Sequence, residues 1–315
     1  MKITRQLATD GTFCPSAINV LQQIPSNANY YVQQRIRHPE STYRLSLQKV
    51  ASAFCAVAGS YLAKTREYNG TIGPEIPEMN QLLLDQEKFL HVLQEHLDEL
   101  WLVLKALIDP SSATKDPLFA DRYVLDNKLP GAKSFQEAIS AYKSSQRITN
   151  KLKHQQGYLR GVAVWTTAGP HFGYFLEEPD ANGALGPSPD IHPDQCAISF
   201  ARDLLWHLFN VYMCSDKLSI AIQRALDARG ISVKPALCSG EQVWEKVVAL
   251  AQELPFSYFP RDRDRKVVSF HCDDRSKTLT MEFPRRTQFV LPRIIKVSIA
   301  ITIDGHSPSY KTALI

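Results

Sequence analysis

Large apolar residues recur at three- and four-residue steps from Leu82 to Leu107, and this run limits the folds open to the chain. Such spacing is typical of an α-helix with one apolar face. The helix is expected to begin near Pro77 and to end before Pro110, which gives a rod of roughly 45 Å. A rod of that length needs a partner of similar length. The stretch 41–70 has the same periodicity, so we expect the two helices to form an antiparallel hairpin.

The rest of the chain alternates between helical, strand and loop patterns. Helical periodicity predicts further helices over 134–156 and 197–229, and a shorter one from about 239. Alternating or β-branched runs predict strands over 158–167, 172–177, 267–272, 278–283 and 294–303. Stretches rich in Pro, Gly and Ser predict loops over 110–133 and 179–195.

The order of these elements predicts a mainly α fold. We expect an up-down helical bundle with an inserted β-hairpin and a small C-terminal α+β module. Along the chain, 1–40 is expected to be an N-terminal extension that drapes over the fold, and 41–232 the bundle, with the hairpin and loop inserted at 158–195. The module is expected to occupy 240–315.

The composition is that of an ordinary globular protein, with 44% apolar and 22% charged residues. No apolar run reaches the roughly 18 residues of a membrane span, and no apolar signal segment follows the N-terminus. A cytoplasmic protein without membrane contact is therefore expected. The six cysteines are scattered without a CxxC pair, which favours buried free thiols over disulfides or a zinc site. Because phosphate-binding glycine loops and serine-hydrolase motifs are also missing, we expect no metal and no cofactor.

One group of polar residues suits chemistry on a phosphodiester. In the predicted helix 134–156, Arg147 and His154 are seven positions apart and point within about 20° of each other. Asn150 lies between them on the same side. Histidine can move a proton near neutral pH, and arginine binds phosphate through two parallel hydrogen bonds. RNA supplies its own nucleophile in the 2′-hydroxyl, so cleavage by such a group requires no metal. The alternative interpretation is an ordinary solvated helix face.

Four further residues around this triplet are candidates for RNA contact. They add positive charge and an aromatic ring beside the triplet: Lys151, Lys153, Tyr158 and Arg160.

The long helical hairpin, the loop-rich connection and the helix that ends Asn150-Lys-Leu-Lys-His154 resemble the HEPN superfamily. The segment from Glu99 to Pro110 is also similar in form to the second helix of HEPN-like proteins, and the resemblance covers roughly 42–229. Members are helical bundles with an Arg-x(4–6)-His motif near a helix end, and Arg147-x6-His154 falls at the long limit of that pattern.

This resemblance implies a metal-independent endoribonuclease that acts as a homodimer, with Arg147 and His154 as the catalytic pair and Asn150 as a supporting residue. Such proteins are frequent in toxin–antitoxin and antiviral defence systems, so an antitoxin or another protein partner is implied as well. Two features depart from the family: Ile148 stands where a polar residue commonly follows the arginine, and the hairpin at 158–195 is added. Many HEPN relatives are binding or scaffold modules without nuclease activity, which is the alternative function.

Other candidate groups favour structural roles. His91 and His96 are about 140° apart on their helix and do not make a zinc site. His207 lies among apolar residues and is expected to be a buried histidine with its hydrogen bonds satisfied. The stretch 260–296 has ten Lys or Arg against five Asp or Glu, which is compatible with phosphate contact but more typical of a charged, aggregation-resistant hairpin. An interaction protein could instead pair through the edge of the strand at 294–303.

Overall fold

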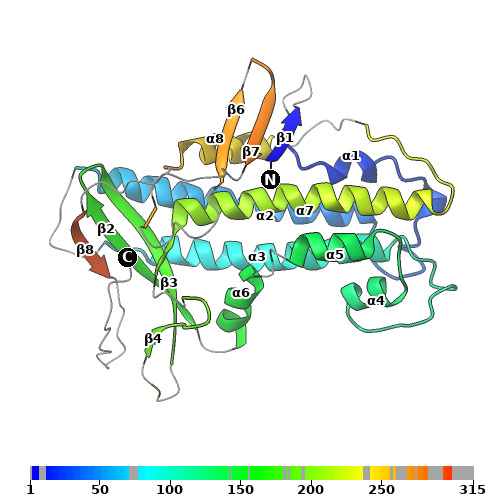
Figure 1. Ribbon diagram of the computed structural model, residues 1–315, viewed down its shortest axis with the longest axis horizontal. Helices are drawn as coiled ribbons and strands as arrows, with labels where there is room; N and C mark the ends of the chain where they lie inside the picture. The colour runs from blue at the N-terminus through cyan, green and yellow to red at the C-terminus, as the bar shows by residue number, and fades with distance from the viewer. Residues whose placement is uncertain are drawn as a thin grey trace.

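Three long helices form the centre of the molecule (Figure 1). They are α2 (Pro39–Glu67), α3 (Asn80–Lys105) and α7 (Phe200–Asp227), and they run side by side along the long axis. The computed structural model describes residues 2–6, 12–70, 77–140, 142, 144–154, 157–179, 183, 185–192, 196–236, 242–255, 258–259, 268–273, 275–282 and 294–299. The expected hairpin of two long helices is confirmed, because α2 and α3 pack against each other along their length.

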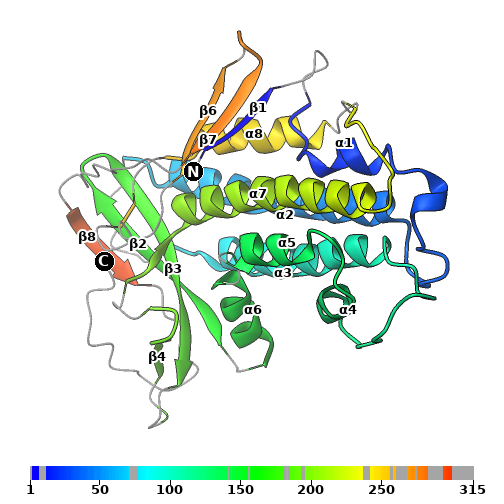
Figure 2. The same ribbon diagram turned by 45° about the vertical axis from the view of Figure 1, so that its right-hand side comes forward.

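Shorter helices cover the central three on two sides (Figures 1 and 2). On one side lie α1 (Ala17–Leu21), which packs on α7, and α8 (Val243–Glu253), which packs on α2. The opposite side carries α4 (Ala120–Asp126), α5 (Ala132–Ser140) and α6 (Ser144–His154). A short 3-10 turn, η1 (Ser26–Ala28), lies in the N-terminal segment.

Two antiparallel sheets complete the fold. The smaller sheet has the strand order β1 (Lys2–Gln6), β7 (Thr278–Glu282) and β6 (Ser269–Asp273). The larger sheet has the order β4 (Leu185–Pro187), β3 (Gly169–Pro179), β2 (Tyr158–Thr166) and β8 (Ile294–Ile299), and β5 (Ile198–Ser199) also pairs with β3. This sheet crosses one end of the three long helices (Figure 1).

The core is continuous between the helices and the sheets. One cluster of buried apolar side chains includes Leu97 of α3, Leu208 of α7, Trp165 of β2 and Leu279 of β7. A glycine is required where β3 passes closest to its neighbours. A Cβ on Gly173 would lie 2.5 Å from the carbonyl oxygen of Ile198 and closer still to the Phe259 ring.

The prediction of a mainly α bundle is wrong, and the protein is a mixed α/β fold. Within the described residues, helices account for about 52%, and they are joined by two antiparallel sheets. The hairpin β2–β3 is buried at most of its positions, so it is a layer of the fold and not an added insertion.

The strands that pair in the two sheets come from distant parts of the chain. This explains why the order of the elements along the sequence led to the wrong fold class. β1, from the expected N-terminal extension, pairs with β7, and β8, from the expected C-terminal module, pairs with β2 through Val162 and Ile299. Hydrogen bonding between strands far apart in sequence leaves no local pattern. The segments predicted as 1–40, 41–232 and 240–315 therefore share sheets.

The predicted single helix over 134–156 is also wrong. The described chain forms α5, a turn at Tyr142, and then α6 in a new direction (Figure 1). The reason is packing. α5 places Phe135 and Ile139 in the core and packs on α7, whereas α6 packs on α3. One straight helix does not reach both partners.

Candidate functional site

The short helix α6 separates a buried face from a polar one. Ile148 and Thr149 are buried, and the Thr149 hydroxyl donates a hydrogen bond to the carbonyl oxygen of Leu90 in α3, with 3.4 Å between the oxygens. These contacts fix the rotation of the helix about its axis. Because residues seven apart return to nearly the same side, Arg147 and His154 share the opposite face.

The polar face of α6 is exposed and cationic. The side chains of Arg147, Asn150, Lys153 and His154 are all exposed. Among the described residues, no hydrogen bond or ion pair engages any of these four side chains. The helix contains no acidic residue. The structure therefore brings the predicted triplet to one accessible surface that attracts anions.

Lys151 is used differently from its neighbours on α6. Its Nζ lies 2.6 Å from Oε2 of Glu178 and 3.4 Å from Oδ2 of Asp190, and its side chain is only 13% exposed. Desolvation lowers the pKa of Lys151, but the hydrogen bonds and charges of Glu178 and Asp190 outweigh it and raise the pKa. The Ser188 hydroxyl donates to the other oxygen of Glu178. Lys151 thus ties the end of α6 to β3 and the following loop.

Arg160 is engaged in the same way on the adjacent strand. Its guanidinium lies 2.8 Å from Oε2 of Glu177, whose side chain is buried. The central carbon of the Arg160 guanidinium, Cζ, is 5.6 Å from the centroid of the Tyr158 ring. Tyr158 is 58% exposed. Tyr158 therefore presents an exposed aromatic ring, in cation–π contact with Arg160, shortly after the end of α6.

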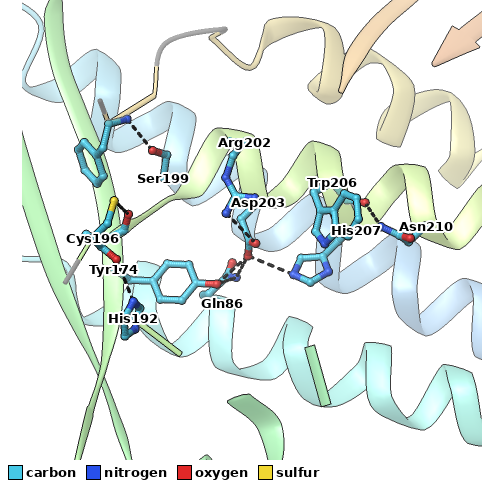
Figure 3. Close-up of polar contacts among 12 residues, drawn as sticks. Gln86, Tyr174, His192, Cys196, Ser199, Arg202, Asp203, Trp206, His207 and Asn210 are labelled. Carbon is cyan, nitrogen blue, oxygen red and sulfur yellow. Dashed lines mark hydrogen bonds and ion pairs between the residues drawn. The ribbon is translucent and has the colours of Figure 1, made fainter. Parts of the chain in front are cut away.

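A buried polar cluster centres on Asp203 of α7 (Figure 3). Oδ2 of Asp203 accepts hydrogen bonds from the Tyr174 hydroxyl at 2.6 Å and from Nε2 of Gln86 at 3.1 Å. Nε2 of His207 lies 3.1 Å from the same oxygen, and the Arg202 guanidinium is 3.5 Å from Oδ1. The cluster joins α3, β3 and α7.

The partners of Asp203 keep it ionised. Burial raises the pKa of its carboxyl group, but the charges and hydrogen bonds of His207, Arg202 and Tyr174 outweigh burial and hold the pKa well below its usual range. His207 is 2% exposed, and its other ring nitrogen, Nδ1, lies 3.0 Å from the hydroxyl of Tyr142. The prediction of a buried, satisfied His207 is confirmed.

The cluster is linked to the segment before α6 through Tyr142. This residue forms the turn between α5 and α6, so its bond to His207 fixes the direction in which α6 leaves the bundle. Sequence reasoning missed Gln86, Tyr174, Arg202 and Asp203. A signal was present in Asp203 and His207, an acid and a histidine four positions apart in an otherwise apolar helix.

Two other histidines are buried and structural. His96 of α3 lies against Ser46 of α2, with 2.6 Å between its Nδ1 and the serine oxygen, and desolvation lowers its pKa to about 4. His192 accepts a hydrogen bond from the Leu176 amide and lies 2.9 Å from the Cys196 carbonyl oxygen, which holds the loop after β3 (Figure 3).

Comparison with protein-family models, with curated proteins and with solved structures gives no match for this chain. In the parts of the chain that the structure describes, no three His, Cys, Asp or Glu residues are grouped to hold a metal ion. None of the described helices is both long and apolar enough to cross a membrane. The cysteines within the described residues are free thiols.

Proposed function

We propose that this chain binds RNA through the exposed face of α6. The observation that supports this most is that Arg147, Asn150, Lys153 and His154 face solvent together, without a hydrogen bond or ion pair to a described residue and with no acid on the helix. A described acid outside the helix, Asp98 of α3, interacts with the charge of Lys153. Neutralisation of phosphates by such side chains supplies most of the affinity of proteins for nucleic acid. Tyr158 adds an exposed ring on which an unpaired base can stack.

Lys151 and Arg160 have a supporting role in this proposal. Both are paired with carboxylates, so a phosphate would have to displace Glu178 or Glu177 to reach them. We assign them to positioning: Lys151 holds the end of α6, and Arg160 holds the ring of Tyr158. Direct contact with RNA is assigned to the uncommitted side chains.

The test is the affinity for a fluorescent single-stranded RNA, measured by anisotropy at low salt. Arg147→Ala and Lys153→Ala are expected to weaken binding several-fold each. Lys133→Ala is the matched control, because Lys133 is an exposed lysine at the far end of α5. Absence of binding by the wild type, or equal loss in all three variants, would contradict the proposal.

Cleavage of the bound RNA is the second candidate function. Arg147 and His154 are both exposed on one side of α6, as a pair acting on a phosphodiester requires. In this role the 2′-oxygen forms a bond to the adjacent phosphorus while the bond from phosphorus to the 5′-oxygen breaks, as in the HEPN ribonucleases that the sequence resembles. His154 takes up the proton of the 2′-hydroxyl and returns it to the leaving 5′-oxygen, and Arg147 stabilises the charge on the phosphate. The resemblance also implies a homodimer and a role as a toxin or defence effector, and a cytoplasmic location is part of the same proposal.

Incubation with total RNA in the presence of EDTA tests this second function. Cleavage by the wild type that is lost in His154→Ala supports a ribonuclease, provided that the assay uses enough protein to saturate the RNA and so offset any weaker binding by the variant. If the wild type binds RNA but leaves it intact, the chain is a non-catalytic RNA-binding protein. The two assays thus test RNA binding and RNA cleavage separately, and either proposal can be rejected without the other.

A further inference from the structure

The two most exposed large apolar side chains in the described part of the chain are neighbours. Leu118 is 89% exposed and Phe119 is 68% exposed, at the start of α4. They lie at the end of the molecule away from the β2–β3 sheet (Figures 1 and 2). Single exposed apolar residues are common, but two adjacent side chains this exposed indicate a contact surface. We name residues 116–121 the apolar tip.

The apolar tip is held in place before any partner arrives. Oδ1 of Asn127 accepts hydrogen bonds from the amides of Thr114 and Lys115, and its Nδ2 donates to the carbonyl oxygens of Lys115 and Tyr123. The loop before the tip is therefore clamped onto α4. A segment that is already ordered loses little conformational entropy on binding.

A groove of matching character lies on the outer side of the α2–α3 pair. Its volume is about 480 Å³, and its apolar lining comes from Leu45, Ala53 and Ala56 of α2 and Val92 of α3. The small side chains on α2 make the hollow, and Leu45, 43% exposed, forms one wall. A hollow of this size accommodates one or two large apolar side chains.

The charged side chains within the two surfaces have opposite net signs. The groove is lined by two lysines and one glutamate, and Lys49 pairs with Glu95 at 3.3 Å. Lys88 makes no ion pair with any described residue. On the tip, Asp116 and Asp121 are the charged residues nearest to Leu118 and Phe119 on either side, and neither is in an ion pair within the described chain.

We propose that a second copy of this chain occupies the groove, by inserting its apolar tip between α2 and α3. The contact joins two different surfaces, so repetition builds a ring or an open chain of molecules. The contact area is small, and we expect reversible association that grows with protein concentration. It does not involve α6 and is independent of RNA binding.

Sedimentation velocity of the full chain over a wide concentration range tests this proposal. The wild type is expected to increase in mass with concentration. Phe119→Ser removes the anchor, and Ser52→Arg fills the groove from an exposed position; each should weaken association at least about tenfold. Leu185→Ser is the matched control, because Leu185 is an exposed apolar residue in β4, which belongs to the sheet at the other end of the molecule (Figure 1). It should associate as the wild type does.

A mixture of the two variants gives the sharper result. The Phe119→Ser protein keeps an intact groove and the Ser52→Arg protein keeps an intact tip, so together they should form a dimer and nothing larger. A wild type that stays monomeric at every concentration would overturn the proposal. So would a mixture that stays monomeric while the wild type associates, or a Phe119→Ser protein that associates normally.

Discussion

The hydroxyl of Tyr142 lies 3.0 Å from Nδ1 of His207, and this contact ties the turn between α5 and α6 to the middle of α7. Both residues are buried. His207 in turn contacts Asp203, so the direction of α6 depends on a charged cluster inside the protein. The exposed face of α6, which we propose binds RNA, is thereby joined to a buried support.

Removal of the Tyr142 hydroxyl should loosen α6. We expect Tyr142→Phe to lower the free energy of unfolding by about 1–2 kcal/mol, because Nδ1 of His207 loses its partner inside the core. Chemical denaturation measures this loss, and hydrogen exchange of the α6 amides should become faster. Tyr31→Phe is the control, since that hydroxyl has no hydrogen bond to a described residue. If hydrogen exchange of the α6 amides is unchanged in Tyr142→Phe, the bond between Tyr142 and His207 does not hold α6 in place, and the prediction is contradicted.

Asp203→Asn should be more damaging than the tyrosine change. The substitution keeps the shape but removes the charge that Arg202 and His207 face in the core, and breaking a buried charge pair costs about 3–5 kcal/mol. Because the folded pKa of Asp203 lies below its unfolded value of about 3.9, its stabilising effect is complete above that pH. The effect should decline as the pH falls below about 4. Stability curves of both proteins against pH test this, and a difference that grows on acidification would contradict it.

His96 should make the protein sensitive to mild acid. Its pKa is about 4 in the fold and about 6.5 when unfolded, so protonation favours the unfolded chain. Stability from this group is complete above pH 6.5 and should fall by roughly 3 kcal/mol as the pH drops to 4. His96→Gln should flatten this part of the curve. His91→Gln on the same helix is the control, because the His91 side chain is partly exposed. Equal pH dependence in both variants would exclude His96 as the cause.

Gly173→Ala should destabilise the larger sheet. The new Cβ would lie 2.5 Å from the backbone oxygen of Ile198, which cannot move without breaking the pairing of β5 with β3. We expect a loss of about 2 kcal/mol in the free energy of unfolding. Gly186→Ala in β4 is the matched control, because a Cβ at that position would have open space within 4 Å. If the two variants have the same melting temperature, the strands around Gly173 can move apart enough to accommodate the new Cβ, and the prediction is contradicted.

The sequence predicted the elements better than their assembly. The periodicity of Leu82–Leu107 and the apolar runs before and after Gly169 are local patterns, so α3 and the β2–β3 hairpin were found. The pairing of β8 with β2 joins residues more than a hundred positions apart, and no local pattern specifies it. The mixed α/β fold was missed for that reason.

The candidate site shows the same division. The spacing of Arg147, Asn150 and His154 was enough to place them on one face, because an α-helix fixes that relation locally. The pairing of Lys151 with Glu178 depends on how α6 meets β3, which the sequence does not specify. The spacing of Asp203 and His207 hinted at the buried cluster, but their partners Gln86 and Tyr174 come from other elements.

The salt dependence of RNA affinity tests most directly whether the α6 face binds phosphates. For single strands, the slope of log affinity against log salt is about −0.7 for each phosphate that is neutralised. Lys153→Ala should make the slope shallower by about that amount, whereas Lys133→Ala should leave it unchanged. Equal slopes for Lys153→Ala and the wild type would contradict phosphate binding at α6.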